Sequence, residues 1–163
     1  PDERHIRKDD VRSLRKMLTT YNKEKGGLRE LNIEGYPTRD LMELILETRP
    51  EQVTLVPDPP HVLTSNAGWN VAENLPFLKE VVRDIHKIGS RVSLFIDVFS
   101  WSEKETSALL SIHPERVELY TERYAKSFQT PEQNAVLSTY SQTARLLTEK
   151  GFGINAGHDL NLQ

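Results

Sequence analysis

The chain has 163 residues, of which 21 are Lys or Arg and 24 are Asp or Glu, so its formal net charge is −3. This near balance excludes a protein that coats nucleic acid through a general basic excess. The absence of cysteine excludes disulfides, thiolate nucleophiles and zinc–sulfur sites. With 37% hydrophobic and 28% charged residues, the composition is typical of a globular protein, and the length predicts a single domain over residues 1–163.

Helix and strand patterns alternate along the chain, and no linker or low-complexity segment divides it. Helices are indicated by apolar residues three and four positions apart, and strands by short apolar or alternating runs that Gly or Pro terminates. The predicted elements are, in chain order, a helix over 8–21, a strand over 28–34, a helix over 38–49, a strand over 53–56, a helix over 75–88, a strand over 91–97, a helix over 102–112, a strand over 117–119, a helix over 131–150 and a strand over 152–156. The connection over 58–74 is a long polar loop.

This alternation predicts right-handed crossovers and a parallel sheet, which is either a doubly wound open sheet or part of a (β/α)8 barrel. An open sheet is covered by helices on both faces, so its strands are apolar on both. In the strand over 91–97, however, Ser93, Phe95 and Asp97 share one face, and Glu118 points away from its apolar neighbours. Polar residues on one face favour a barrel whose inner surface leads to a site.

Ionisable side chains stand where several predicted strands end. In a barrel, reactive groups lie at the C-terminal ends of strands and in the loops just after them. The positions of this kind are Glu34, Asp58, Asp97, Glu118 and the pair His158-Asp159. A histidine and one or two carboxylates around one mouth suit general acid–base catalysis.

The same residues also have structural interpretations, which the spacing alone leaves open. Asp97 at a strand end could cap the following helix, Glu118 could form a buried ion pair with a lysine or arginine such as Arg123, and His158 could be a hydrogen-bonded loop residue. A metal site is not expected, because no two histidines stand at ligand spacing and no carboxylates cluster locally. No phosphate-binding P-loop, dinucleotide-binding glycine motif or nucleophilic serine elbow occurs either.

Six groups of short motifs occur together and in one order. They are Pro1-Asp2-Glu3-Arg4-His5-Ile6; Leu31-Asn32-Ile33-Glu34; Leu55-Val56-Pro57 with Leu63-Thr64-Ser65; Val92-Ser93-Leu94-Phe95-Ile96-Asp97; Val117-Glu118-Leu119-Tyr120-Thr121 with Tyr124-Ala125; and Asn155-Ala156-Gly157-His158-Asp159-Leu160. With these motifs the chain resembles the pyridoxine 5′-phosphate synthase family across essentially its whole length. The resemblance implies a (β/α)8 TIM barrel, of which the chain covers roughly the end of strand 2 to the loop after strand 7. We therefore expect an internal part of a longer chain.

The resemblance also implies an activity. The family's enzymes are transferases that condense 3-amino-2-oxopropyl phosphate with 1-deoxy-D-xylulose 5-phosphate, giving pyridoxine 5′-phosphate, phosphate and water by acid–base catalysis without a cofactor. It implies a cytoplasmic homo-oligomer, an octamer, with no nucleic-acid or membrane partner. Two alternatives stay open: another phosphosugar-binding TIM-barrel enzyme, such as an isomerase or epimerase, and a catalytically inactive barrel fragment.

Carried over residue by residue, the resemblance implies three catalytic groups. Glu34 matches the proton acceptor, His158 the proton donor, and Glu118 a glutamate that stabilises a transition state. The implied substrate contacts are His5 and Thr64 for deoxyxylulose phosphate, and Asp159, through its backbone, for the aminoacetone phosphate.

The chain departs from the family pattern at two places. Asn66-Ala67-Gly68-Trp69 stands where many members have an acidic residue and paired glycines, and Tyr120 stands where many have His. The first departure is expected to alter how the loop closes. The second is expected to change a hydrogen bond to a residue that supports the catalytic groups. The loop over 58–74 is a candidate lid, because reactive imine and enol intermediates must be kept from water.

Overall fold

The computed structural model describes residues 6–58 and 67–161, and in them five parallel strands form one sheet. The strands are β1 (Asn32–Gly35), β2 (Gln52–Leu55), β3 (Arg91–Ile96), β4 (Arg116–Tyr120) and β5 (Gly153–Gly157). Each strand pairs with the next one along the chain, in the order β1-β2-β3-β4-β5. This sheet has no point at which the strand order reverses, as a doubly wound sheet does, so the order is that of a barrel wall.

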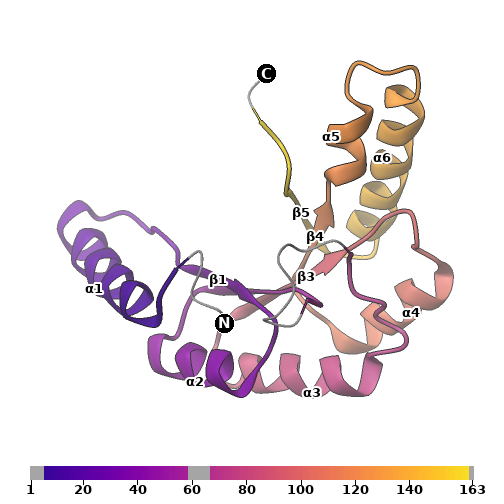
Figure 1. Ribbon diagram of the computed structural model, residues 1–163. Coiled ribbons are helices and arrows are strands. Elements are labelled where there is room, and N and C mark those ends of the chain that lie inside the picture. Colours follow the sequence, from indigo (N-terminus) through magenta and orange to yellow (C-terminus); the bar gives the residue numbers. More distant parts are fainter. Residues whose placement is uncertain (1–5, 59–66, 162–163) are drawn as a thin grey trace.

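Helices in the described residues follow one another around the outer side of this sheet (Figure 1). They are α1 (Lys8–Lys25), α2 (Arg39–Thr48), α3 (Leu75–His86), α4 (Glu103–Ile112), α5 (Glu122–Ser127) and α6 (Gln133–Glu149). The sequence marks two of the helix starts: the side chain of Thr38 accepts a hydrogen bond from the Leu41 amide, and that of Ser102 from the Glu105 amide. None of the described helices is long and apolar enough to cross a membrane.

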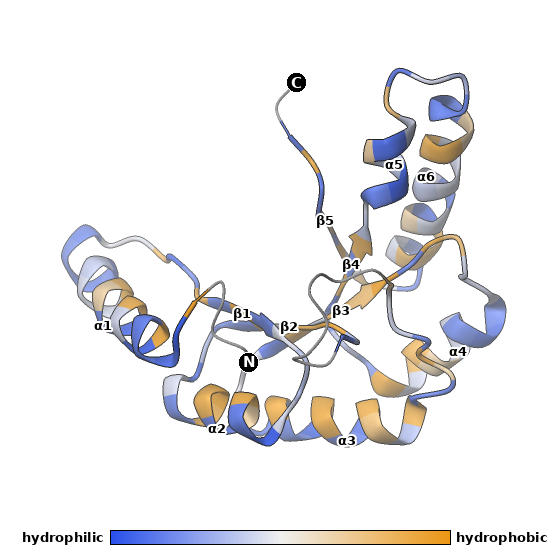
Figure 2. Ribbon diagram, viewed as in Figure 1, coloured by the Kyte–Doolittle hydropathy of each residue, from blue (hydrophilic) through white to orange (hydrophobic). Residues whose placement is uncertain are grey.

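The two faces of the sheet differ in chemistry. The outward residues of the central strands are apolar and fully buried, such as Val53 and Leu94, and they pack into a core with Leu78 and Ile85 of α3. Apolar residues accordingly concentrate on α2, α3 and the central strands, whereas α1 is mostly hydrophilic (Figure 2). The inner face carries polar residues: Glu34, Thr54 and Ser93 lie side by side on β1, β2 and β3 in the strand register. Phe95 lies on the same face of β3, beyond Ser93.

Several element boundaries differ from the sequence prediction. The helix predicted over 8–21 continues to Lys25, and Gly26 ends it in the left-handed conformation with φ 62°. The strand predicted from Leu28 begins only at Asn32. Leu28 is 92% exposed, so it does not pack against the core as a strand residue would. Helix α5 was not predicted, and α6 begins at Gln133 and not at Pro131.

The second half of the loop predicted over 58–74 is tied to the core. The Trp69 amide donates to the Phe95 carbonyl at 2.8 Å, and the Trp69 indole donates to the Leu55 carbonyl at 2.9 Å. The buried carboxylate of Glu105, on α4, accepts from the Val71 amide at 2.6 Å. Buried hydrogen bonds and apolar packing therefore attach this part of the loop to the core. Residues 59–66 of the candidate lid lie outside the described residues, and the lid stays a prediction.

Candidate active site

Three ionisable side chains from distant parts of the chain meet at the C-terminal edge of the sheet. They are Glu34 on β1, Glu118 on β4 and His158, which directly follows β5. The Nε2 atom of His158 lies 3.6 Å from Oε1 of Glu34, and its Nδ1 atom lies 3.6 Å from Oε1 of Glu118. The imidazole therefore stands between the two carboxylates, each facing a different ring nitrogen.

This contact requires a strongly curved sheet. Strands β1 and β5 are the two edge strands of the described sheet, and four inter-strand spacings separate them. In a flat sheet that separation is about 19 Å, at roughly 4.8 Å per spacing, which exceeds the reach of a glutamate and a histidine together. Because Glu34 and His158 lie within 3.6 Å of each other, the sheet must curl around them as a barrel wall does.

Aromatic rings and an unusual backbone conformation fix the place of His158. Its ring centroid lies 4.5 Å from that of Phe95 and 5.9 Å from that of Tyr120. The residue has φ 77°, and Asp159 after it has φ 57°, both in the left-handed region that non-glycine residues seldom adopt. Strained backbone of this kind clusters at functional sites, where the surroundings hold it.

The electrostatics of the site favour a protonated imidazole. The Glu118 carboxylate beside Nδ1 raises the pKa of His158 above its ordinary value, burial opposes this rise, and the charges of Glu34 and Asp159 add to it. Burial together with the charge of Glu122 raises the pKa of Tyr120 to about 12, so its phenol stays neutral. A histidine with a raised pKa between two carboxylates is an arrangement in which the imidazole can donate a proton and a carboxylate can accept one.

Neither the pairing of Glu118 with Arg123 nor the capping of a helix by Asp97 is found in the structure. Arg123 does not pair with Glu118 but lies over the Phe99 ring, with its guanidinium carbon 4.3 Å from the ring centroid. Asp97 does not cap α4, which Ser102 caps; its Oδ1 accepts from the Phe99 amide at 2.9 Å in a local turn. The Glu118 side chain is 12% exposed and faces the imidazole.

The remaining predicted residues are placed only in part. Asp159 adjoins His158 and is exposed, so its backbone and its side chain lie at the mouth. The predicted substrate contacts His5 and Thr64 lie outside the described residues. The three described residues with catalytic predictions are brought together, whereas their roles in catalysis stay predictions.

Sequence reasoning missed the residues that shape the site without reacting. Phe95 was assigned only to a strand face, although its ring packs against the imidazole. Gly157 was named only as part of a motif, although a Cβ atom there would lie 2.3 Å from Oε1 of Glu118. In the strand register Gly157 pairs with Tyr120, two residues beyond Asn155, the partner of Glu118, so the two residues lie on the same face of the sheet.

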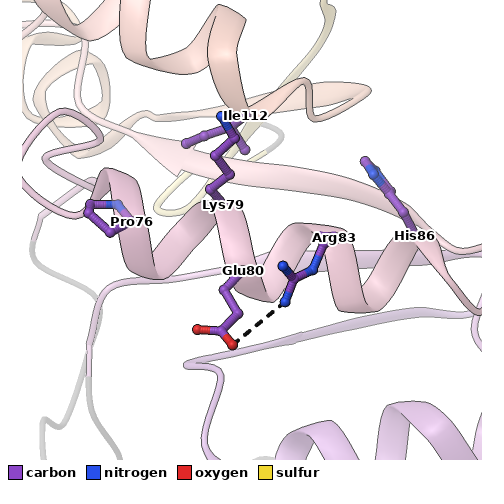
Figure 3. Close-up of a pocket in the computed structure, with 6 residues that line it drawn as sticks. All are labelled: Pro76, Lys79, Glu80, Arg83, His86 and Ile112. Carbon is purple, nitrogen blue, oxygen red and sulfur yellow. Dashed lines mark ion pairs between the residues drawn. The ribbon is translucent and has the colours of Figure 1, made fainter.

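Other features of the described residues do not suggest a second reactive centre. No group of three or more His, Asp or Glu in residues 6–58 and 67–161 is arranged to hold a metal ion. A pocket of about 590 Å³ lies on the outer surface beside α3, away from the sheet's C-terminal edge. Figure 3 shows its lining, in which Arg83 reaches toward Glu80.

Comparison with known proteins relates the whole chain to one family. The family model described as pyridoxal phosphate biosynthesis protein PdxJ matches residues 1–163. The chain is 46% identical to the pyridoxine 5′-phosphate synthase of Porphyromonas gingivalis and 43% identical to that of Phocaeicola vulgatus, in both cases over 99% of the chain. It is 41% identical to the enzyme of the same name from Christiangramia forsetii over 100% of the chain. The chain spans 63% of the length of each of these relatives.

Proposed function

The chain belongs to the PdxJ family of pyridoxal phosphate biosynthesis proteins, and we propose that the whole protein is a pyridoxine 5′-phosphate synthase. Membership confirms the predicted family and its (β/α)8 barrel, of which the five parallel strands form a part. The proposed reaction condenses 3-amino-2-oxopropyl phosphate with 1-deoxy-D-xylulose 5-phosphate and releases phosphate and water. The observation that carries the proposal is the imidazole of His158 held between the carboxylates of Glu34 and Glu118.

This arrangement suits the chemistry of ring closure. An amine must attack a ketone, water must leave, and a carbon–carbon bond must form, so protons move on and off carbon and oxygen several times. We assign Glu34 as the proton acceptor and His158, with its raised pKa, as the proton donor. Glu118, at Nδ1, supports the imidazolium and stabilises positive charge that develops in the transition state.

The substrates and the assembly belong to the same proposal. Two phosphorylated substrates require phosphate-binding groups, which loops and helix starts at this edge of a barrel commonly supply. His5 and Thr64 are proposed to contact deoxyxylulose phosphate, and the Asp159 backbone the aminoacetone phosphate. A cytoplasmic homo-octamer is proposed from the family resemblance.

A two-substrate assay on the whole protein tests the function. Pyridoxine 5′-phosphate should form only when both substrates are present, with one phosphate released per product. The rival reading, a phosphosugar isomerase or epimerase, predicts conversion of deoxyxylulose phosphate alone without any amine. Product from the single sugar substrate, or no product from the pair, contradicts the proposal.

A further inference from the structure

Thr121 occupies a helix start but does not use its side chain there. It is the residue before α5, a position where threonine commonly accepts a hydrogen bond from a helix amide. Its hydroxyl makes no such bond with α5. The side chain is directed instead to the end of β5, and Thr121 is 4% exposed.

At the end of β5, Thr121 holds two consecutive carbonyl groups. Its amide donates to the Gly157 carbonyl at 3.1 Å, and its hydroxyl reaches the same oxygen at 2.6 Å. The hydroxyl also contacts the carbonyl oxygen of His158. These contacts lie just beyond the last pair of the β4–β5 ladder, Tyr120 with Gly157, and extend it by one residue.

The residue held in this way is the one with the strained backbone. His158 has φ 77°, and such a conformation persists only where neighbouring groups enforce it. Glu118 lies on β4, and Thr121 directly follows the last residue of that strand. The Thr121 contacts therefore fix the backbone of His158 relative to the strand that carries one of its two carboxylate partners.

We propose that Thr121 is a positioning residue, which sets the orientation of the His158 imidazole between Glu34 and Glu118 by holding the backbone of residues 157–158 against the end of β4. It touches no reacting atom. The inference rests on the proposed function for its kinetic part only, because the orientation of the imidazole can be measured without turnover.

The test replaces Thr121 in the whole protein by Val, which keeps the shape and removes the hydroxyl, and by Ser, which keeps the hydroxyl. Thr48→Val is the matched control, since Thr48 is also buried and donates to a backbone carbonyl, that of Leu44, at 2.7 Å, far from the mouth. The readouts are the NMR titration of His158, the pH dependence of kcat, and KM for both substrates.

Thr121→Val should lower the pKa of His158, because the imidazole moves away from both carboxylates. It should lower kcat by about 10- to 100-fold, the cost of displacing a catalytic group by roughly 1 Å, and should change KM by less than about 3-fold. The pH above which kcat falls should move downward. Thr121→Ser and Thr48→Val should each keep the wild-type His158 pKa, the wild-type kcat and the wild-type pH dependence of kcat.

A lower melting temperature for Thr121→Val with an unchanged His158 titration and an unchanged kcat overturns the proposal, because Thr121 is then structural only. If Thr121→Val does not fold, Thr121→Ala, which removes bulk instead of placing a methyl group against the carbonyls, is measured in its place. Failure of the proposed function would look different. If the wild type forms no pyridoxine 5′-phosphate but the His158 titration still shifts in Thr121→Val, the positioning role of Thr121 holds and the assigned reaction is wrong.

Discussion

Replacing Gly157 by alanine should disturb the centre of the site with a single methyl group. The new Cβ atom would lie 2.3 Å from Oε1 of Glu118, and the backbone at Gly157 itself does not adopt a positive φ, so the effect is steric. To reach ordinary van der Waals contact, the carboxylate must retreat by at least roughly 1 Å. Because Glu118 and His158 are only 3.6 Å apart, this retreat weakens one of the two carboxylate contacts of the imidazole.

The size of the effect follows from the distance. At an effective dielectric constant of about 20, moving the two charges from 3.6 Å apart to roughly 1 Å further weakens their attraction by up to about 1 kcal/mol. That energy corresponds to about a fivefold loss of proton affinity at the imidazole. The pKa of His158 should therefore fall in Gly157→Ala, and kcat should fall by about 5- to 100-fold as the geometry of the site is lost.

The assay is an NMR titration of His158 together with steady-state kinetics of the whole protein. Gly27→Ala is the matched control, because a Cβ atom there meets no other atom within 4 Å and Gly27 has no positive φ. A His158 titration in Gly157→Ala that coincides with wild type would contradict this prediction, since it would mean that the position of the Glu118 carboxylate does not affect the pKa of the imidazole.

Three further results are expected from the same contacts. Glu118→Gln should lower the pKa of His158 in an NMR titration, because the charge beside Nδ1 is removed; an unchanged titration contradicts the assigned contact. Gly68→Ala should reduce the free energy of unfolding by about 1–3 kcal/mol or more in urea denaturation, since its Cβ atom would lie 2.0 Å from the Asp97 amide nitrogen; wild-type stability would show that this turn is loose. The contribution of His158 to the free energy of unfolding should be complete below its unfolded pKa of about 6.5, and it should decrease as the pH rises through its higher folded pKa. The difference in free energy of unfolding between wild type and His158→Asn should therefore shrink as the pH rises over that range.

The sequence predicted the strand ends well because they depend on local patterns. The alternation in Val92–Asp97 marks a strand with one polar face, and the barrel rule then points to the residues at its C-terminal end. Glu34, Glu118 and His158 were all found by this rule. It required no knowledge of how the strands are arranged beyond their being parallel.

The sequence predicted that Glu34 and His158 lie around one mouth of a barrel, but not that their side chains come within 3.6 Å of each other. Their contact depends on the curvature of five strands, which is set by the strand stagger and tilt and not by any local pattern. The role of Glu105 is equally non-local, since its carboxylate reaches back along the sequence to the Val71 amide. The polar composition of the loop therefore concealed that Trp69 and Val71 are buried in the core.

Helix α5 was missed for a different reason. It has only six residues, too few for an apolar stripe to repeat, and only Ser127 among them is buried. Its position still matters, because the turn that starts it brings the Thr121 hydroxyl to the end of β5. A short helix of this kind is evident only after the strands on either side have been placed.

The most direct test of the acid–base account is the rate at which the whole protein with Glu34→Gln forms pyridoxine 5′-phosphate at saturating concentrations of both substrates. The substitution keeps the size of the side chain and removes the proton acceptor that faces Nε2 of His158. The account predicts a rate about 10²- to 10⁴-fold below wild type, with a melting temperature close to wild type. A near-normal rate would contradict the assignment of Glu34 as the base and would make Glu118 the better candidate.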